Sequence, residues 1–362
     1  MTILQKRGGL PRLGARLRAK ETARIVAFGS SITHDAYYLE PLVPRLRGEF
    51  PGADVDVLVR SLPGFMSFWA VHRTQSIAEL DPDLVIVEFA VNDHGLQVPE
   101  LTLKSIEGIV RRLRASAAPP DIVFVYFMSR LVEALPRQAA VIELWERVAA
   151  HYGVPSIDCS ALAEHFVQTG QAIWLDRWPG RPAWETRNHP VALTRDLSHH
   201  TFEGGRLLGE EMAQAIAAAA ADGSAQRNGM PAPLHADHFA EAKVYFPADL
   251  CTHGWTRKRV DDSTQTQLTV MYFSEILVPE RAGATLEFTF EGRTLAIWGY
   301  SSPNNVITLD GNQASLNLPD SRMAFPTFIV RQDVPSTHRI RIEVREFPFE
   351  LGALDVMGSL RL

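Results

Sequence analysis

The chain has 362 residues, enough for two domains, with 46% hydrophobic and 22% charged residues, an ordinary balance for a globular protein. Its formal net charge of −6 lies in no long acidic or basic run, which excludes the concentrated positive surface that nucleic-acid binding requires. No stretch resembles a membrane span or a signal-peptide core, so we expect a cytoplasmic protein with no membrane or nucleic-acid partner.

The first two-thirds of the chain alternates short apolar runs with stretches whose apolar residues follow helical spacing. The predicted strands cover residues 24–31, 55–62, 83–93, 121–129 and 154–160. The predicted helices cover residues 38–50, 70–80, 103–115, 138–151 and 202–221. This alternation favours a parallel sheet with helices on both faces, which is a three-layer α/β/α domain. In such sheets the functional loops lie at the carboxyl ends of the strands.

The last third of the chain has a different pattern. Residues 223–234 mix glycine, proline and small polar residues, which predicts a linker between a first domain, 20–222, and a second, 235–362. In the second domain apolar and polar side chains alternate, as they do over residues 286–290, and turn signals recur at short intervals. We therefore expect an antiparallel β-sandwich, similar to a jelly roll, with a surface through which homo-oligomers could form.

The strongest local signal is Gly-Ser-Ser-Ile-Thr, residues 29–33, where the first strand passes into a helix. Ser31 would lie beside free backbone N–H groups that can stabilise developing negative charge. The same sequence also suits a simple helix cap, so alone it does not establish a nucleophile. Further along, Asp196 and His199 form an Asp-x-x-His pair that could orient an imidazole to accept a serine proton, or could be two solvated loop residues.

The order of these blocks resembles that of the SGNH hydrolases, the GDSL-like lipases and esterases, over residues 24–220. The usual Gly-Asp-Ser block matches residues 29–31, with Ser30 in place of the aspartate. The glycine that follows the second strand in this superfamily matches Gly64. The Gly-x-Asn-Asp block matches residues 90–93, with alanine in place of glycine.

The last block of the resemblance is Asp-x-x-His-Pro, which matches residues 196–200 with His200 in place of proline. Either histidine could serve as the base. A glycine lies five residues beyond the catalytic histidine in the resembled pattern, and Gly204 stands at that distance from His199. The spacing therefore favours His199 over His200.

The resemblance implies a flavodoxin-like SGNH domain and serine esterase chemistry. Ser31 would be the nucleophile, His199 its base and Asp196 the residue that orients the base. The backbone N–H groups of Ser31 and Gly64 and the side-chain amide of Asn92 would form the oxyanion hole. This chemistry needs no metal and no organic cofactor, so we expect neither.

The substrate is indicated less directly. Trp174, Trp178 and Trp184 lie in an irregular segment before the histidine turn, where they could stack on sugar rings or pack against the protein. Three aromatic residues of the second domain, Trp255, Trp298 and Tyr300, leave the same two alternatives open. Because the β-domain resembles carbohydrate-binding modules, we expect a short-chain acyl ester, foremost an O-acetyl ester, of a small molecule or oligosaccharide. An O-acyltransferase of the same fold and a non-catalytic carbohydrate-binding protein are the alternative functions.

Overall fold

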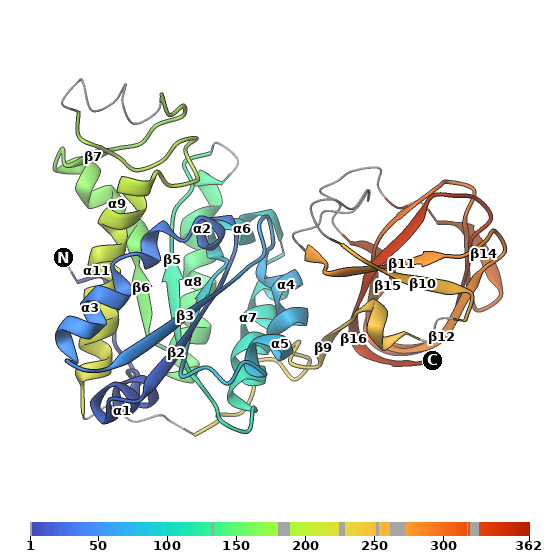
Figure 1. The fold of residues 1–362 in the computed structure, drawn as a ribbon, viewed down its shortest axis with the longest axis horizontal. Helices are drawn as coiled ribbons and strands as arrows, with labels where there is room; N and C mark the ends of the chain where they lie inside the picture. Colours follow the sequence, from blue (N-terminus) through green and yellow to red (C-terminus); the bar gives the residue numbers. More distant parts are fainter. Residues whose placement is uncertain are drawn as a thin grey trace. The chain divides into compact units, whose positions relative to one another are not determined.

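The computed structural model describes residues 2–96, 98–131, 134–179, 189–223, 229–250, 253–260, 272–316, 318 and 326–362. The chain forms two compact units, Met1–Ala240 and Glu241–Leu362. Each unit has its own sheet and its own hydrophobic core. Figure 1 shows both units, coloured from blue at the N-terminus to red at the C-terminus.

The first unit is built on a six-stranded sheet of order β1-β6-β5-β4-β2-β3. Its parallel strands are β2 (Thr22–Gly29), β3 (Asp54–Ser61), β4 (Leu84–Glu88), β5 (Asp121–Tyr126) and β6 (Ser156–Asp158), and β1 (Leu4–Gln5) pairs antiparallel with β6. Every residue of β4 and β5 is buried, as expected where helices cover both faces. The chain passes from β2 to β3 and then returns to β4 on the other side of β2, so the topological switch point lies between β2 and β4.

Helices cover the two faces of this sheet in separate groups (Figure 1). One group is α1 (Pro11–Ala19), α3 (Leu42–Glu49), α9 (Cys159–Gln168) and α11 (Phe202–Ala221). The other is α4 (Ser67–Ala70), α5 (Thr74–Ala78), α7 (Pro99–Arg114) and α8 (Leu135–Tyr152). The predicted three-layer α/β/α architecture is therefore confirmed. None of the helices in the described part of the chain is long and apolar enough to cross a membrane.

Several predicted boundaries were wrong. The helix expected over residues 38–50 is a 3-10 turn, η1 (Tyr37–Leu39), followed by α3, because Pro41 lacks the N–H that a continuous helix needs. The helix expected over 70–80 is split into α4, η2 (Val71–Arg73) and α5. The strand expected to reach residue 93 ends at Glu88, and the helical turn α6 (Ala90–Asp93) follows. Short apolar runs fit a strand and a buried helix equally well, so only packing distinguishes them.

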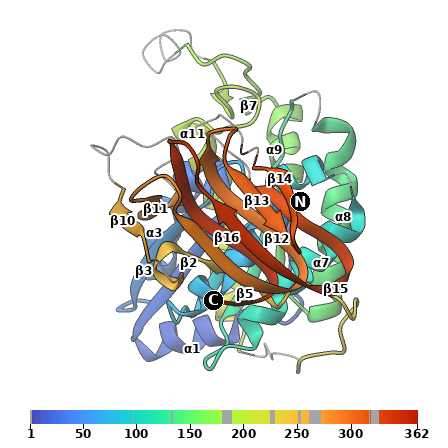
Figure 2. The same cartoon turned by 90° about the vertical axis from the view of Figure 1, so that its right-hand side faces the viewer.

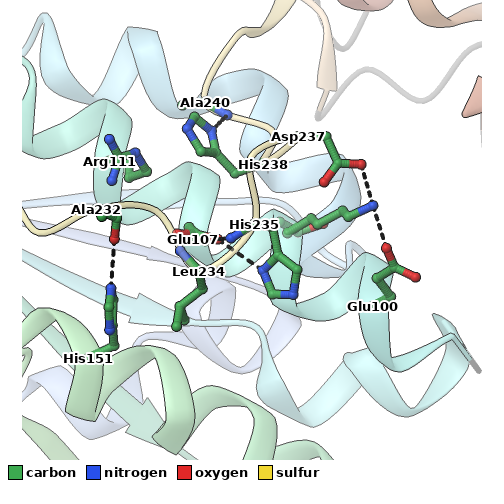
Figure 3. A network of polar contacts seen from close by, with 12 residues as sticks. Glu100, Glu107, Arg111, His151, Ala232, Leu234, His235, Asp237, His238 and Ala240 are labelled. Carbon is green, nitrogen blue, oxygen red and sulfur yellow. Dashed lines mark hydrogen bonds and ion pairs between the residues drawn. The ribbon is translucent and has the colours of Figure 1, made fainter. Parts of the chain in front are cut away.

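The described end of the segment that we expected to be a linker, residues 229–234, is fastened to the first unit (Figure 3). Glu107 on α7 has no exposed side-chain surface and accepts hydrogen bonds from the backbone N–H of Leu234 (2.6 Å) and from the N–H and Nδ1 of His235 (both 3.0 Å). Tyr152 of α8 donates its hydroxyl to the same carboxylate at 2.5 Å. A buried carboxylate requires such donors, so residues 234 and 235 pack with the first unit, and the second unit begins at residue 241 rather than 235.

The second unit is one antiparallel sheet of eight strands (Figure 2). Its strands are β9 (Ala242–Tyr245), β10 (Trp255–Arg259), β11 (Glu275–Pro279), β12 (Thr285–Ser301), β13 (Val306–Leu309), β14 (Asn312–Ser315), β15 (Thr327–Glu343) and β16 (Phe349–Arg361). The register of β12 shifts between Gly292 and Thr294, and both halves of this strand contribute apolar side chains to one core. The sheet therefore curls around that core. The predicted antiparallel β-domain is confirmed, but its described strands form one curled sheet and not the two packed sheets of a sandwich.

The two tryptophans that we considered for sugar binding in this domain are core residues. Trp255 and Trp298 are 4% and 1% exposed. Their indole N–H groups donate to Thr285 O (2.9 Å) and to Asp355 Oδ2 (2.7 Å). Their rings and their polar atoms are thus both satisfied inside the domain, which excludes them as surface contacts to a sugar.

Candidate active site

The structure brings Ser31, Asp196 and His199 together at the carboxyl edge of the sheet. Ser31 is the first residue of helix α2 (Ser31–Asp35), directly after β2, and the other two lie in the turn before α11. Nε2 of His199 lies 2.9 Å from the Oγ of Ser31, and its Nδ1 lies 2.8 Å from Oδ2 of Asp196. Because an ionised carboxylate only accepts hydrogen bonds, Nδ1 carries the imidazole proton and Nε2 is left to accept the Ser31 proton.

The turn that carries these two residues is held on several sides. The Oδ1 of Asp196 accepts the backbone N–H of His199 at 2.7 Å. Leu197 between them has φ of 65°, which a leucine seldom adopts; its N–H donates to Leu175 O and its carbonyl accepts the N–H of Arg130, both at 2.7 Å. Burial raises the pKa of Asp196, but the hydrogen bonds from His199 outweigh it, so the net pKa lies below the ordinary range and the carboxylate is ionised at neutral pH.

His200 occupies a different environment from His199. Its side chain is 2% exposed, and its ring packs edge-on against Phe127 with centroids 4.9 Å apart. Burial lowers the pKa of His200 to about 3, with a smaller contribution from His199. The ring is therefore neutral and enclosed, so of the two histidines only His199 faces the Ser31 hydroxyl.

Gly64 and Asn92 lie in two turns that are joined to each other. Gly64 has φ of 79°, a conformation that favours glycine, in the turn after β3. The N–H of Leu62 at the start of this turn donates to Gly29 O at 2.8 Å, which ties it to the end of β2. The Asn92 side chain donates one amide N–H to Phe65 O at 2.9 Å. The amide has a second N–H, which this contact does not use.

Asp93, the neighbour of Asn92, braces this turn. Its Oδ1 accepts the N–H of Ser67 at 2.7 Å and its Oδ2 accepts the indole N–H of Trp145 at 2.9 Å. Asp93 is 2% exposed, and burial raises its pKa to about 6. These partners belong to α4 and α8, so Asp93 connects α6 to the helix layer and makes no contact with Ser31 or His199.

Comparison with known proteins shows what the first domain is similar to. Residues 27–193 match the GDSL-like Lipase/Acylhydrolase family. The matched residues, most of the first domain, are similar to GDSL-like acylhydrolases. The match stops three residues before Asp196, so the place of Asp196 and His199 beside Ser31 comes from the three-dimensional arrangement. No curated protein sequence matches the chain.

Among solved structures, the chain is similar to a two-domain esterase (CEX) active on acetylated mannans. In its crystal with mannopentaose the likeness covers 98% of this chain and 98% of that one, with a TM-score of 0.70 and 19% sequence identity. A second crystal structure of that esterase gives 98% and 99% coverage, a TM-score of 0.71 and 19% identity. At this identity the likeness shows a shared fold in both domains.

The three tryptophans predicted to bind substrate differ in their places in the first domain. Trp174 is half-buried against the core of the first unit, and the guanidinium of Arg130 lies 5.9 Å from its ring centre. Trp178 is also half-buried, and its backbone N–H donates to Arg195 O at 2.9 Å, directly before Asp196. Trp184 lies outside the described residues. Trp178 is thus tied to the turn that carries His199, whereas Trp174 combines packing with a partly exposed ring.

Sequence reasoning missed two contacts around Ser31. Arg195 forms an ion pair with Asp35 at 2.8 Å and so connects the Asp196 turn to α2. Glu88, at the end of β4, is fully buried and accepts hydrogen bonds from residues on either side of Ser31. An acidic residue in an otherwise apolar strand was the available signal for Glu88. In the described part of the chain, no three His, Cys, Asp or Glu side chains gather closely enough to hold a metal ion.

Proposed function

We propose that the protein is a serine esterase that hydrolyses short-chain acyl esters, foremost O-acetyl groups on a carbohydrate, through an acyl-Ser31 intermediate. The observation that carries this proposal is the hydrogen-bonded series Asp196, His199 and Ser31, with distances of 2.8 and 2.9 Å. The series lies at the carboxyl edge of the sheet beside the switch point between β2 and β4, where α/β proteins bind ligands.

In the first step the Ser31 Oγ attacks the ester carbonyl carbon while its proton passes to Nε2 of His199. The ionised Asp196 stabilises the imidazolium that forms. The carbonyl oxygen becomes an oxyanion near the N–H groups of Ser31 and Gly64 and the second amide N–H of Asn92. The intermediate then collapses, the C–O bond to the alcohol breaks, and the alcohol takes the proton from His199.

In the second step water releases the acyl group. His199 accepts a proton from the water as its oxygen attacks the acyl-Ser31 carbonyl carbon. The same oxyanion donors serve the second tetrahedral intermediate. Its collapse breaks the bond to Ser31, which recovers its proton from His199, and the carboxylic acid leaves.

The substrate class rests on two supports. Trp178 lies beside the Asp196 turn, and Trp174 has a partly exposed ring next to the cation of Arg130, so an aromatic face and a hydrogen-bond donor are available for a sugar. The esterase with a similar two-domain fold is active on acetylated mannans. Acetylated oligosaccharides are therefore the first substrates to test.

The test compares wild-type protein with Ser31→Ala on p-nitrophenyl acetate and on longer-chain p-nitrophenyl esters. We expect release by the wild type, strongest for acetate, and none by the variant. Ser116→Ala, which changes a serine beyond the end of α7, is the matched control and should keep full activity. Equal release by wild type and Ser31→Ala would contradict the proposed function.

Acetylated mannan oligosaccharides then test the substrate class. Free acetate that forms only with an intact Ser31 supports hydrolysis. An added unacetylated oligosaccharide that becomes acetylated in place of acetate release would instead indicate an acyltransferase. Binding of the oligosaccharide with neither product would indicate a carbohydrate-binding protein without activity.

A further inference from the structure

A buried carboxylate lies directly beneath the turn that carries Ser31. Glu88 is the last residue of β4 and pairs in parallel register with Gly29, the last residue of β2. Its side chain has no exposed surface. Among the described residues, no lysine, arginine or histidine forms an ion pair with it. Burying a carboxylate without a cationic partner costs free energy, so other interactions must stabilise Glu88 in this position.

All the hydrogen bonds to the Glu88 side chain come from the nucleophile turn. Its Oε2 accepts the backbone N–H of Ser30 and the Ser30 hydroxyl, both at 3.1 Å, and the hydroxyl of Thr33 at 2.9 Å. Because the Thr33 proton is donated to Glu88, the Tyr38 hydroxyl donates to Thr33 Oγ1, at 2.9 Å. Ser31 lies between the two residues that Glu88 holds.

These contacts replace an ordinary helix cap. Ser30 is the N-cap residue of α2, and an N-cap side chain usually accepts the N–H of the second or third helical residue, here Ile32 or Thr33. The Ser30 side chain makes no such bond, and its hydroxyl donates to Glu88. The Thr33 N–H interacts with the Glu88 carboxylate instead. The capping acceptor thus comes from the neighbouring strand.

We propose that Glu88 is a positioning residue: it caps the nucleophile helix from strand β4, in place of the aspartate for which Ser30 is substituted, and so sets Ser31 Oγ against His199. This inference rests on the proposed role of Ser31 as nucleophile. The turn has little freedom to adjust by itself, since a Cβ on Gly29 would lie 2.0 Å from Thr33 Oγ1. A misplacement of about 1 Å can cost roughly a hundredfold in rate, so loss of the cap should be visible in turnover.

Four variants test the proposal in p-nitrophenyl acetate hydrolysis at pH 8. In Glu88→Gln one amide oxygen replaces two carboxylate oxygens, and it has too few lone pairs for the N–H and hydroxyl donors of both Ser30 and Thr33. The NH2 group faces the remaining donors, so we expect kcat to fall by about ten- to a hundredfold with KM nearly unchanged. In Ser30→Asp two carboxyl groups meet in a buried space, and kcat should fall as well. In the double variant Ser30→Asp/Glu88→Gln, the aspartate can cap Thr33 from its own chain, and kcat should return to within about threefold of wild type.

Glu107→Gln is the matched control, because it neutralises another carboxylate with no exposed side-chain surface, one that holds residues 234 and 235. It should lower the melting temperature and leave kcat within about twofold of wild type, since a lost structural hydrogen bond changes stability and not the geometry at Ser31. All rates are divided by the folded fraction measured by near-ultraviolet circular dichroism. A purely structural role of Glu88 would make Glu88→Gln behave like this control.

Two results would overturn the inference. One is a folded Glu88→Gln variant with wild-type kcat. The other is a double variant that is no more active than Glu88→Gln, because the cap would then not be exchangeable between positions 30 and 88. Should Glu88→Gln not fold, the rise in kcat from Ser30→Asp to the double variant decides the same question. Ser31→Ala separates the two proposals: an active Ser31→Ala contradicts the proposed function, whereas an inactive one beside a fully active Glu88→Gln contradicts only the role of Glu88.

Discussion

Replacing Asp196 with asparagine separates the charge of this side chain from its shape. An asparagine oxygen can still accept the N–H groups of Ser198 and His199, which now donate to Oδ1 at 3.1 and 2.7 Å, so the turn keeps its geometry. The asparagine NH2 group, however, would lie where Oδ2 now accepts from His199 Nδ1 at 2.8 Å. His199 must then carry its proton on Nε2, and it can no longer accept the proton of Ser31.

The expected loss of kcat depends on how exposed the side chains of Asp196 and His199 are. A wrong histidine tautomer costs about 10⁴-fold in kcat in an enclosed protease triad. Here the side chains of Asp196 and His199 are 44% and 32% exposed, so water can partly replace the carboxylate. We therefore expect a smaller loss, about 10³-fold in kcat, which corresponds to about 4 kcal/mol of transition-state stabilisation.

The assay is steady-state hydrolysis of p-nitrophenyl acetate, with kcat and KM measured separately. KM should change little, because Asp196 does not contact the substrate. Asp176→Asn, at an exposed position in the same region, is the matched control and should keep wild-type kcat. A loss of less than about tenfold in Asp196→Asn would refute the argument that this carboxylate sets the tautomer of His199.

Further variants test the other parts of the site and the fold. Asn92→Ala should lower kcat by about 10²- to 10³-fold with little change in KM, because one oxyanion donor is lost. His200→Asn should keep most of the activity that His199→Asn abolishes in the same assay, because the His200 ring is enclosed beside Phe127. Glu107→Gln should lower the free energy of unfolding by about 1.5–3 kcal/mol in urea titrations at pH 7. Burial raises the pKa of Glu107, but its hydrogen bonds outweigh burial and hold the pKa below the ordinary value of 4.5. The stabilisation is therefore present above pH 4.5 and is lost as the pH falls through the folded-state pKa, which acid titration of both proteins checks. Burial raises the pKa of Glu88 from 4.5 to about 7, so the unfolded chain loses this proton at a lower pH than the folded protein does. The free energy of unfolding should therefore fall by about 3 kcal/mol as the pH rises from 4.5 to 7. This pH dependence should be absent in Glu88→Gln.

Local patterns in the chain determined much of this architecture. The apolar runs that became β4 and β5 are fully buried, as a nearly continuous apolar sequence predicts for strands covered on both faces. The closing helix appears in the structure with the bounds 202–221 that its spacing predicts. Ser31, Gly64 and Asn92 could be named as candidates because each lies in a short sequence motif that follows a predicted strand.

Only the tertiary structure decided which side chains meet. Ser31 and His199 are 168 positions apart, and their contact depends on the order in which the strands assemble. Glu88 reads as one charge in an apolar run, and its function as a cap arises because β4 lies beside β2. In the sequence, Trp255 and Trp298 fit a contact to a sugar and a place in the core equally well. Only the curled sheet shows that both are buried. Hydrophobic periodicity is a property of neighbours along the chain, whereas a site is made by contacts between elements that only the packed sheet brings together.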